Sequence, residues 1–183
     1  MGAIIDIIGS LALRGVILAL VMNLILTLRD AEYERTSVAS TTQNLATAAR
    51  VLERDLKYVG YYSDTTSLTS FLLASNDRVL FLGDIDDNGK IDTVDIRLAD
   101  DPSGKSGSKV IARSVDGGLP LYLAHGSVSM NIQYYNSLGA TTTTLDDILS
   151  LSLLLTQKNE YSMTDTSAST IKKEIWIFPA NLQ

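Results

Sequence analysis

The chain of 183 residues contains no cysteine, and it has only one histidine and three prolines. Without cysteine it cannot form disulfide bonds, thiol nucleophiles or zinc sites built from thiolates. The single histidine, His125, has no second histidine and no acidic pattern beside it, so an ordinary turn residue is the simplest interpretation. Stability must therefore come from packing and from contacts between subunits.

Basic clusters and enzyme motifs are also missing. The net charge is −6 with a pI near 4.7, and no run of Lys and Arg is present that could neutralise a nucleic-acid backbone. The sequence has no G-x-S-x-G, P-loop or G-x-G-x-x-G pattern, and PSGKSGS is only loosely similar to a phosphate-binding loop. We expect neither nucleic-acid binding nor enzymatic activity.

What the chain does have is an apolar stretch at residues 1–28, in which the charged residues are Asp6 and Arg14. A helix that simply crosses a bilayer needs about 20 apolar residues, and a charge near its middle costs several kcal/mol. Residues 15–28 provide only 14 uncharged residues. A secretory signal peptide would have basic residues first and a cleavage site after them, whereas here an acid comes first and RDAE follows. We expect a retained helix that lies in the membrane at one stage and against other protein at another.

The helical pattern continues beyond this stretch. Residues 30–62 contain no proline, and their first glycine is Gly60. Apolar residues recur there with helical spacing, at Val38, Leu45, Ala49, Leu52, Leu56 and Val59. Because no breaker separates Leu28 from Arg29, we expect one helix of about 60 residues, roughly 90 Å long at 1.5 Å per residue. Gly60 and the polar residues 63–67 would end it.

After the helix the apolar residues recur with a period of two, the pattern of strands with one buried face. We expect strands at 78–82, 93–98, 109–115, 121–123, 127–136, 148–157 and 170–178, joined mostly as hairpins. The amphipathic half of the helix is the element available to cover the apolar face of such a sheet. The predicted fold class is α+β, with the long N-terminal helix packed on an antiparallel sheet. The predicted parts are an apolar assembly or membrane helix, 1–28, and a helix-plus-sheet globular domain, 29–183.

One turn between strands, DIDDNGKIDTVD, has the ligand spacing of a calcium-binding EF-hand loop. The oxygen donors would come from Asp84, Asp86, Asn88, the carbonyl of Lys90, Asp92 and Asp95, with Gly89 at the sharp turn. Ca²⁺ is a possible ligand of this loop. Strands rather than helices flank the loop, however, and Asp and Asn with Gly also form hairpin turns without any ion. Both interpretations stay open.

The order of these features resembles type IV pilin-like proteins, and minor pilins and pseudopilins more than major pilins. The resemblance covers nearly the whole chain: a retained apolar N-terminal helix, the helix ending VLERDLKYVGYY, the hairpin GDIDDNGKIDTVDIRL, and VSMNIQYYNSLG followed by ILSLSLLLTQ. It implies a filament whose core is a bundle of the N-terminal helices, with the sheet domains packed outside. It also implies assembly from the cytoplasmic membrane by a dedicated machine.

Typical members of this family carry a short basic leader and a glutamate at the fifth position of the mature helix. No basic leader is present in this sequence, and loss of Met1 would place Asp6 at the fifth position. Arg14 has no counterpart in the family pattern. Asp6 and Arg14 are about 12 Å apart along a helix, too far for a direct pair, so we expect neighbouring subunits to supply their partners. The alternative is that both lie unpaired near a membrane interface.

The sequence therefore predicts a structural subunit of an extracellular, type IV pilus-like filament, a homo-oligomer that polymerises through its N-terminal helix. The subunit would lie in the cytoplasmic membrane before assembly and at the cell surface afterwards. A low-copy minor pilin or pseudopilin of a secretion or pilus machine is one alternative. A membrane-anchored, monomeric calcium-binding module is another.

Overall fold

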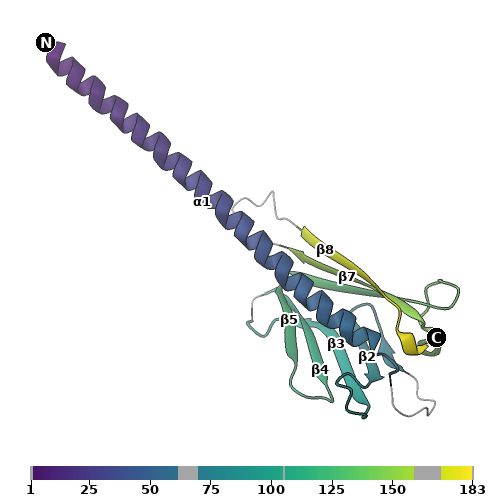
Figure 1. The fold of residues 1–183 in the computed structure, drawn as a ribbon. Coiled ribbons are helices and arrows are strands. Elements are labelled where there is room, and N and C mark those ends of the chain that lie inside the picture. Colours follow the sequence, from purple (N-terminus) through teal and green to yellow (C-terminus); the bar gives the residue numbers. More distant parts are fainter. Residues whose placement is uncertain (1, 62–69, 105, 159–169, 183) are drawn as a thin grey trace. The chain divides into compact units, whose positions relative to one another are not determined.

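The computed structural model describes residues 2–61, 70–104, 106–158 and 170–182, without the side chains of residues 3–6 and 180. The chain forms the helix α1 (Gly2–Lys57) followed by strands, as Figure 1 shows. By their contacts the residues form two compact units, Met1–Ala39 and Ser40–Gln183. The strands are β1 (Phe71–Ala74), β2 (Arg78–Gly83), β3 (Asp92–Asp100), β4 (Lys109–Val115), β5 (Leu121–Gly126), β6 (Val128–Tyr135), β7 (Ser150–Lys158) and β8 (Thr170–Ile177), with short 3-10 turns at η1 (Leu145–Asp147) and η2 (Ala180–Leu182).

The predicted long helix is confirmed, and so is the α+β fold class. The helix ends at Lys57, three residues before Gly60, with the basic side chains of Arg54 and Lys57 in its last turn, where they complement the helix dipole. Gly60 follows with φ of +74°, and its N–H donates to the carbonyl of Leu82 at 3.0 Å. The polar residues 63–67, which the sequence predicts to end the helix, lie outside the described residues.

The strands form two sheets, where the sequence predicted one. The first has the order β1-β2-β3-β4-β5 and the second β6-β7-β8, with antiparallel neighbours throughout. The chain leaves the first sheet at Gly126, whose φ of +101° is in the region that favours glycine. The next strand, β6, pairs with β7 instead of β5. The seven predicted strands are present; β5 extends beyond its predicted end to Gly126, and β1 was not predicted.

The end of α1 lies over both sheets, and its apolar face forms one core with them (Figure 1). This confirms that the helix covers the apolar face of the strands. The buried helix and post-helix residues are Leu45, Ala48, Ala49, Leu52, Leu56 and Val59, and the strands contribute among others Phe71, Phe81, Ile96, Ile111, Ile132, Leu153 and Ile177. Two hydrogen bonds join β6 to the turn after β1: Ile132 N–H donates to Asn76 O at 2.8 Å, and the Tyr134 hydroxyl donates to Ser75 O at 3.0 Å.

The start of the acidic turn is fixed against the end of the helix. Asp84 N–H donates to the carbonyl of Tyr61 at 2.7 Å, immediately after Gly83 at the end of β2. A Cβ atom on Gly83 would lie 2.2 Å from the carbonyl oxygen of Tyr58. Because the two backbones approach so closely, only glycine fits at this position. The contact sets where the turn after β2 begins.

Candidate functional site

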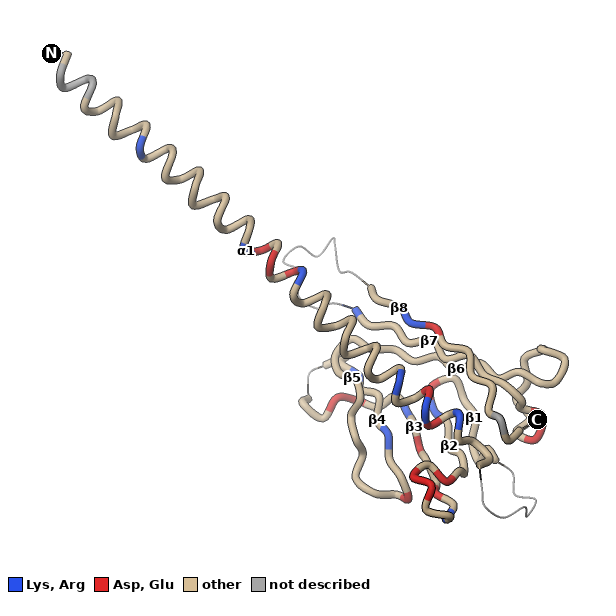
Figure 2. The backbone as a smooth tube through the Cα atoms, in the orientation of Figure 1, with Lys and Arg blue, Asp and Glu red and all other residues tan. Residues whose placement is uncertain are grey.

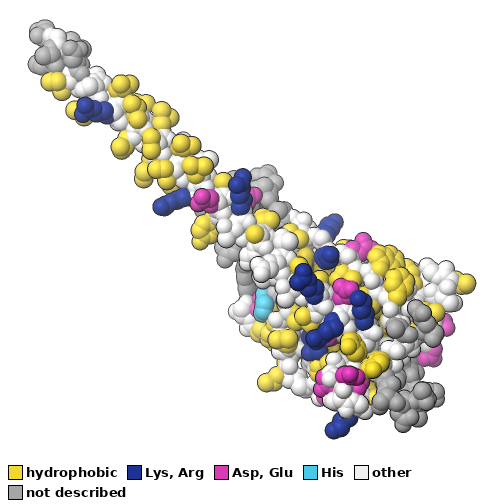
Figure 3. All heavy atoms as spheres, viewed as in Figure 1, with side chains coloured by type: hydrophobic (Ala, Val, Ile, Leu, Met, Phe, Trp, Pro, Cys, Tyr) yellow, Lys and Arg dark blue, Asp and Glu magenta, His cyan; other side chains and the backbone are white. Residues whose placement is uncertain are grey.

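The first unit presents an apolar helical surface. Starting at Ile7, α1 is long and apolar enough to cross a membrane, with a mean hydropathy of 2.2 and none of that window buried in the chain. Figure 3 shows the apolar side chains along this part of the helix. The exposed large apolar residues are Ile7, Ile8, Leu11, Leu13, Val16, Ile17, Leu18, Leu20, Val21, Met22, Leu24, Ile25, Leu26 and Leu28. Such a surface is compatible with insertion into a membrane.

Of the two predicted assembly residues, Arg14 is exposed on this helix, while the side chain of Asp6 lies outside the described residues. Eight residues of α-helix separate the two positions by about 12 Å. Across the described part of the chain, Arg14 forms no ion pair. Its exposed guanidinium is therefore available to a partner outside this chain, either another subunit or the membrane surface.

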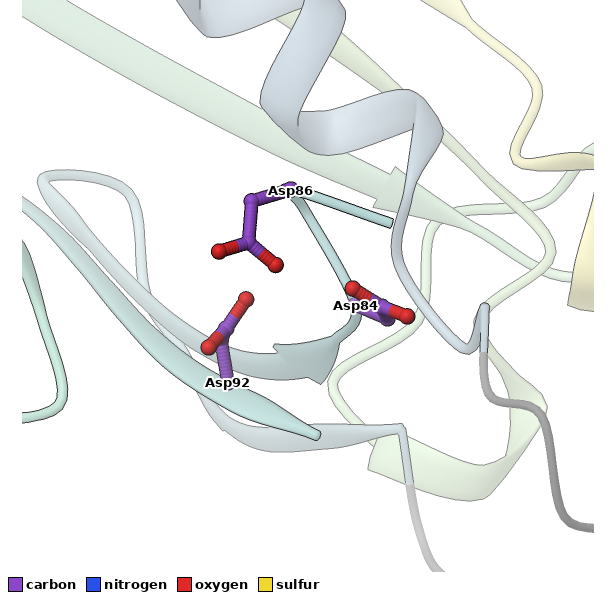
Figure 4. Close-up of side chains that lie close together, drawn as sticks. All are labelled: Asp84, Asp86 and Asp92. Carbon is purple, nitrogen blue, oxygen red and sulfur yellow. The ribbon is translucent and has the colours of Figure 1, made fainter. Parts of the chain in front are cut away.

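The acidic turn brings three of the predicted metal ligands together. Asp84 follows β2, Asp86 lies two residues later in the turn, and Asp92 begins β3. One carboxylate oxygen from each lies within 4.8 Å of the others, and Asp84 and Asp92 are buried while Asp86 is exposed. In Figure 4 the carboxylates of Asp86 and Asp92 point toward each other. Three carboxylates at this spacing could hold a divalent cation, because hard cations prefer oxygen ligands.

The backbone of the turn also stabilises these carboxylates. Asp84 accepts hydrogen bonds from the N–H groups of Asn88 at 3.0 Å and Gly89 at 2.7 Å. The side chain of Asn88 accepts from the N–H of Lys90 at 2.8 Å. Positive φ values at Asp87 (58°) and Gly89 (80°) let the chain fold back. Asp84 thus shapes the turn through these hydrogen bonds.

The surroundings of Asp92 disfavour the charged form of its carboxyl group. Burial raises the pKa of its carboxyl, the charges of Asp86, Asp116 and Asp84 raise it further, and a hydrogen bond from the N–H of Ile85 opposes the rise. That hydrogen bond joins Ile85 N to Asp92 Oδ2 at 3.1 Å. The negative charges gathered here would repel one another less in the presence of a cation.

Asp95 does not join the group. Arg78 binds it with two hydrogen bonds, of 2.9 Å from Nε and 3.1 Å from an Nη atom, and Arg97 donates to it at 2.9 Å. The EF-hand pattern places its twelfth residue on a helix, but here positions 92 and 95 lie in β3. Residues three apart in a strand point to opposite faces, so Asp95 lies away from Asp92.

The remaining predicted ligands, Asn88 and Lys90, are exposed in the turn and are engaged through the hydrogen bond described above. Sequence reasoning missed Asp116, which lies between β4 and β5. Its carboxylate accepts from the N–H of Thr93 at 2.8 Å, and its charge acts on Asp92. The signal that could have identified it is the register of β3 with β4, which pairs Val94 with Val115.

Comparison with known proteins finds no matching family model, curated protein or solved structure.

Proposed function

We propose that this chain is a structural subunit of an extracellular, type IV pilus-like filament and that it polymerises through residues 1–28 of α1. The observation that carries the proposal is the exposed apolar surface from Ile7 to Leu28. The C-terminal part of the same helix contributes its apolar residues to the core that it shares with the strands. A large exposed apolar surface must be covered by lipid or by protein. In this proposal lipid covers it in the cytoplasmic membrane, and neighbouring copies cover it in the filament.

The charges in this segment favour a protein environment for the final state. An arginine within an apolar segment is costly in lipid unless its charge is paired or reaches the interface. Neighbouring helices that are staggered by about 12 Å would bring Asp6 of one copy to Arg14 of the next. The subunit itself needs no active site for this role, and the chain carries none of the common catalytic motifs.

A deletion tests the proposal. Full-length protein and a variant lacking residues 2–28 would be purified in detergent, and the detergent would then be removed. We expect negative-stain images and sedimentation to show filaments only for the full-length chain, while the truncated chain stays a folded, soluble monomer. Filaments from the truncated chain would contradict the helix-core proposal. Short or rare assemblies would favour a low-copy minor pilin or pseudopilin.

A double-mutant cycle tests whether Asp6 and Arg14 of neighbouring subunits pair. Asp6→Ala and Arg14→Ala alone should each reduce the sedimenting fraction sharply, because each leaves a charge without its partner. The double variant should recover part of the loss. A double variant that assembles no better than the worse single variant would show that the two residues are not partners.

A second candidate function is a membrane-anchored, monomeric calcium-binding module. It is favoured by the three carboxylates of Asp84, Asp86 and Asp92, which converge within 4.8 Å. This candidate predicts a monomer in detergent and in vesicles, with no filaments after detergent removal. The same sedimentation experiment therefore separates the two functions.

A further inference from the structure

A group of charged residues follows the apolar surface on α1, and we call it the charged belt. All of its members are exposed, and within the described residues none forms an ion pair. The belt consists of Arg29, Asp30, Glu32, Glu34 and Arg35. Figure 2 shows acidic and basic positions together here, after a long uncharged stretch of α1. Further along the same helix, Glu53 and Lys57 do form a pair, at 2.8 Å.

Two acidic members of the belt share one side of the helix. At about 100° per residue, Asp30 and Glu34 are only about 40° apart around the axis. Like charges four residues apart on a helix repel each other and destabilise the helix. The positions that could offset them, three and four residues before Asp30 and after Glu34, carry no basic residue. This acidic face therefore has no cation from its own helix.

The basic residue Arg35 lies about 120° around the helix from this acidic face. Its own helix offers one acid in reach, Glu32, and among the described ion pairs the two are not joined. A negative face and a positive side chain at different angles on one helix are complementary between copies. The same contact can repeat from copy to copy without closing, which is the arrangement that produces open filaments.

The signs of the charges identify the partner. The belt has three acids and two bases, a net charge of −1, so a negatively charged lipid surface would not be attracted to it. A second copy of the chain supplies both signs at matching positions. We propose that the Asp30/Glu34 face of α1 in one subunit binds Arg35 of a neighbouring subunit. This inference rests on the proposed filament function.

The geometry implies a neighbour other than the one at the Asp6–Arg14 contact. For parallel helices, Arg35 reaches the acidic face when the axial offset is about 2–8 Å, given 1.5 Å per residue. The offset for Asp6 and Arg14 is about 12 Å. The belt therefore adds a second set of subunit contacts to the bundle.

Charge reversals in the full-length chain test the inference. Asp30→Lys/Glu34→Lys and Arg35→Glu should each lower the fraction that sediments after detergent removal several-fold, because each juxtaposes like charges. An equimolar mixture of the two variants should recover at least half of the wild-type fraction. In an alternating polymer every contact between the two variants again joins opposite charges. The lysine face of the first variant meets Glu at position 35 of the second, and the acidic face of the second variant meets Arg35 of the first. Lipid headgroups could not produce this recovery.

The matched control is Glu53→Lys/Lys57→Glu, which reverses an exposed pair that is already satisfied within the helix. It should assemble as the wild type does, and far-UV circular dichroism should show unchanged helix content in all variants. Wild-type filaments combined with reversals that have no effect, or with a mixture that shows no recovery, would overturn this inference and leave the proposed function intact. Failure of the wild-type chain itself to assemble would overturn the proposed function, and the inference with it.

Discussion

The guanidinium of Arg113 on β4 donates from Nε to the carboxylate of Asp55 on α1, and this ion pair joins helix and sheet inside the domain. The side chain of Asp55 is fully buried and that of Arg113 is 13% exposed. Arg54, which is largely exposed, donates to the other carboxylate oxygen of Asp55 at 3.2 Å. Since the described helix residues in the core around Asp55 are apolar, the pair fixes which part of the helix meets β4.

Breaking this pair should be strongly destabilising. Arg113→Met leaves the Asp55 carboxylate buried without its main partner, and such a change typically costs about 3–5 kcal/mol. The double variant Asp55→Leu/Arg113→Met should recover most of that loss, because it replaces two buried charges with apolar groups. Urea unfolding of residues 29–183, followed by the fluorescence of the single tryptophan, Trp176, provides the measurement. A cost below about 1 kcal/mol for Arg113→Met would mean that the pair is dispensable.

The close approach of Gly83 to the helix end predicts a second stability effect. A methyl group there would lie 2.2 Å from the backbone oxygen of Tyr58, and backbone cannot rotate away as a side chain can. Gly83→Ala should cost roughly 1–3 kcal/mol or more through overpacking. Gly117→Ala is the matched control, because its φ is +68° but its site is open; it should cost only about 1 kcal/mol. Equal losses in the two variants, measured by urea unfolding, would argue against the predicted clash.

The sequence was sufficient to predict the elements whose burial is periodic. The helix residues Leu45, Leu52 and Leu56 recur at helical spacing and are buried, and the strand predicted at 109–115 coincides with β4. Both patterns are local, since each follows from one face of one element meeting the core. The fold class followed because an apolar sheet face and an apolar helix face had to cover each other.

The features that the sequence did not reveal depend on contacts between distant residues. The four residues of β1 are uniformly apolar and short, so they show no alternation to indicate a strand. The change of sheet at Gly126 depends on β6 pairing with β7 further along the chain. Asp55 lies 58 residues from Arg113, and no local pattern in the sequence indicates that the two residues pair. In the same way, a spacing pattern does not say which face of a strand a side chain occupies. In this structure Asp95 pairs with Arg78 and Arg97 and lies outside the group of three carboxylates.

Calcium binding at the acidic turn is a prediction that melting curves can decide. If the folded domain holds Ca²⁺, a chelator should lower the melting temperature of residues 29–183, because an ion bound only by the folded state stabilises it. At 100 times the dissociation constant the stabilisation is about 2.7 kcal/mol, or roughly 5–10 °C in a domain of this size.

The structure also indicates the best variant for that experiment. Asp84→Ala would remove the hydrogen bonds that shape the turn. A lower melting temperature of this variant would therefore not distinguish loss of the metal from loss of the turn structure. Asp86→Asn is preferable because Asp86 is exposed, and it should abolish the calcium effect while changing the metal-free melting temperature little. Asp87→Asn, one residue away and outside the group of three, is the control that should keep the effect. Curves that calcium and chelator leave unmoved would support the metal-free hairpin turn.

The raised pKa of Asp92 predicts how stability depends on pH without metal. Burial and neighbouring acids raise the pKa of this carboxyl in the folded state, so the folded domain binds the proton more tightly than the unfolded chain does. Stability should therefore fall as the pH rises from about 4, the ordinary pKa of aspartate, through the raised value in the folded state. The loss is complete only above the raised pKa of the folded state.

Asp92→Asn should remove that loss, because the amide is uncharged while its oxygen can still accept the hydrogen bond from Ile85. In the presence of chelator at pH 7, the variant should melt higher than the wild type, by roughly 2–4 °C for each kcal/mol recovered. The difference should vanish below about pH 4, where the wild-type carboxyl is protonated in both states. With calcium present the order should reverse if the turn binds the ion, because the variant lacks one of the three carboxylates. A variant that melts lower than the wild type at pH 7 in chelator would show that the Asp92 charge is favourable in the folded domain, contrary to the raised pKa.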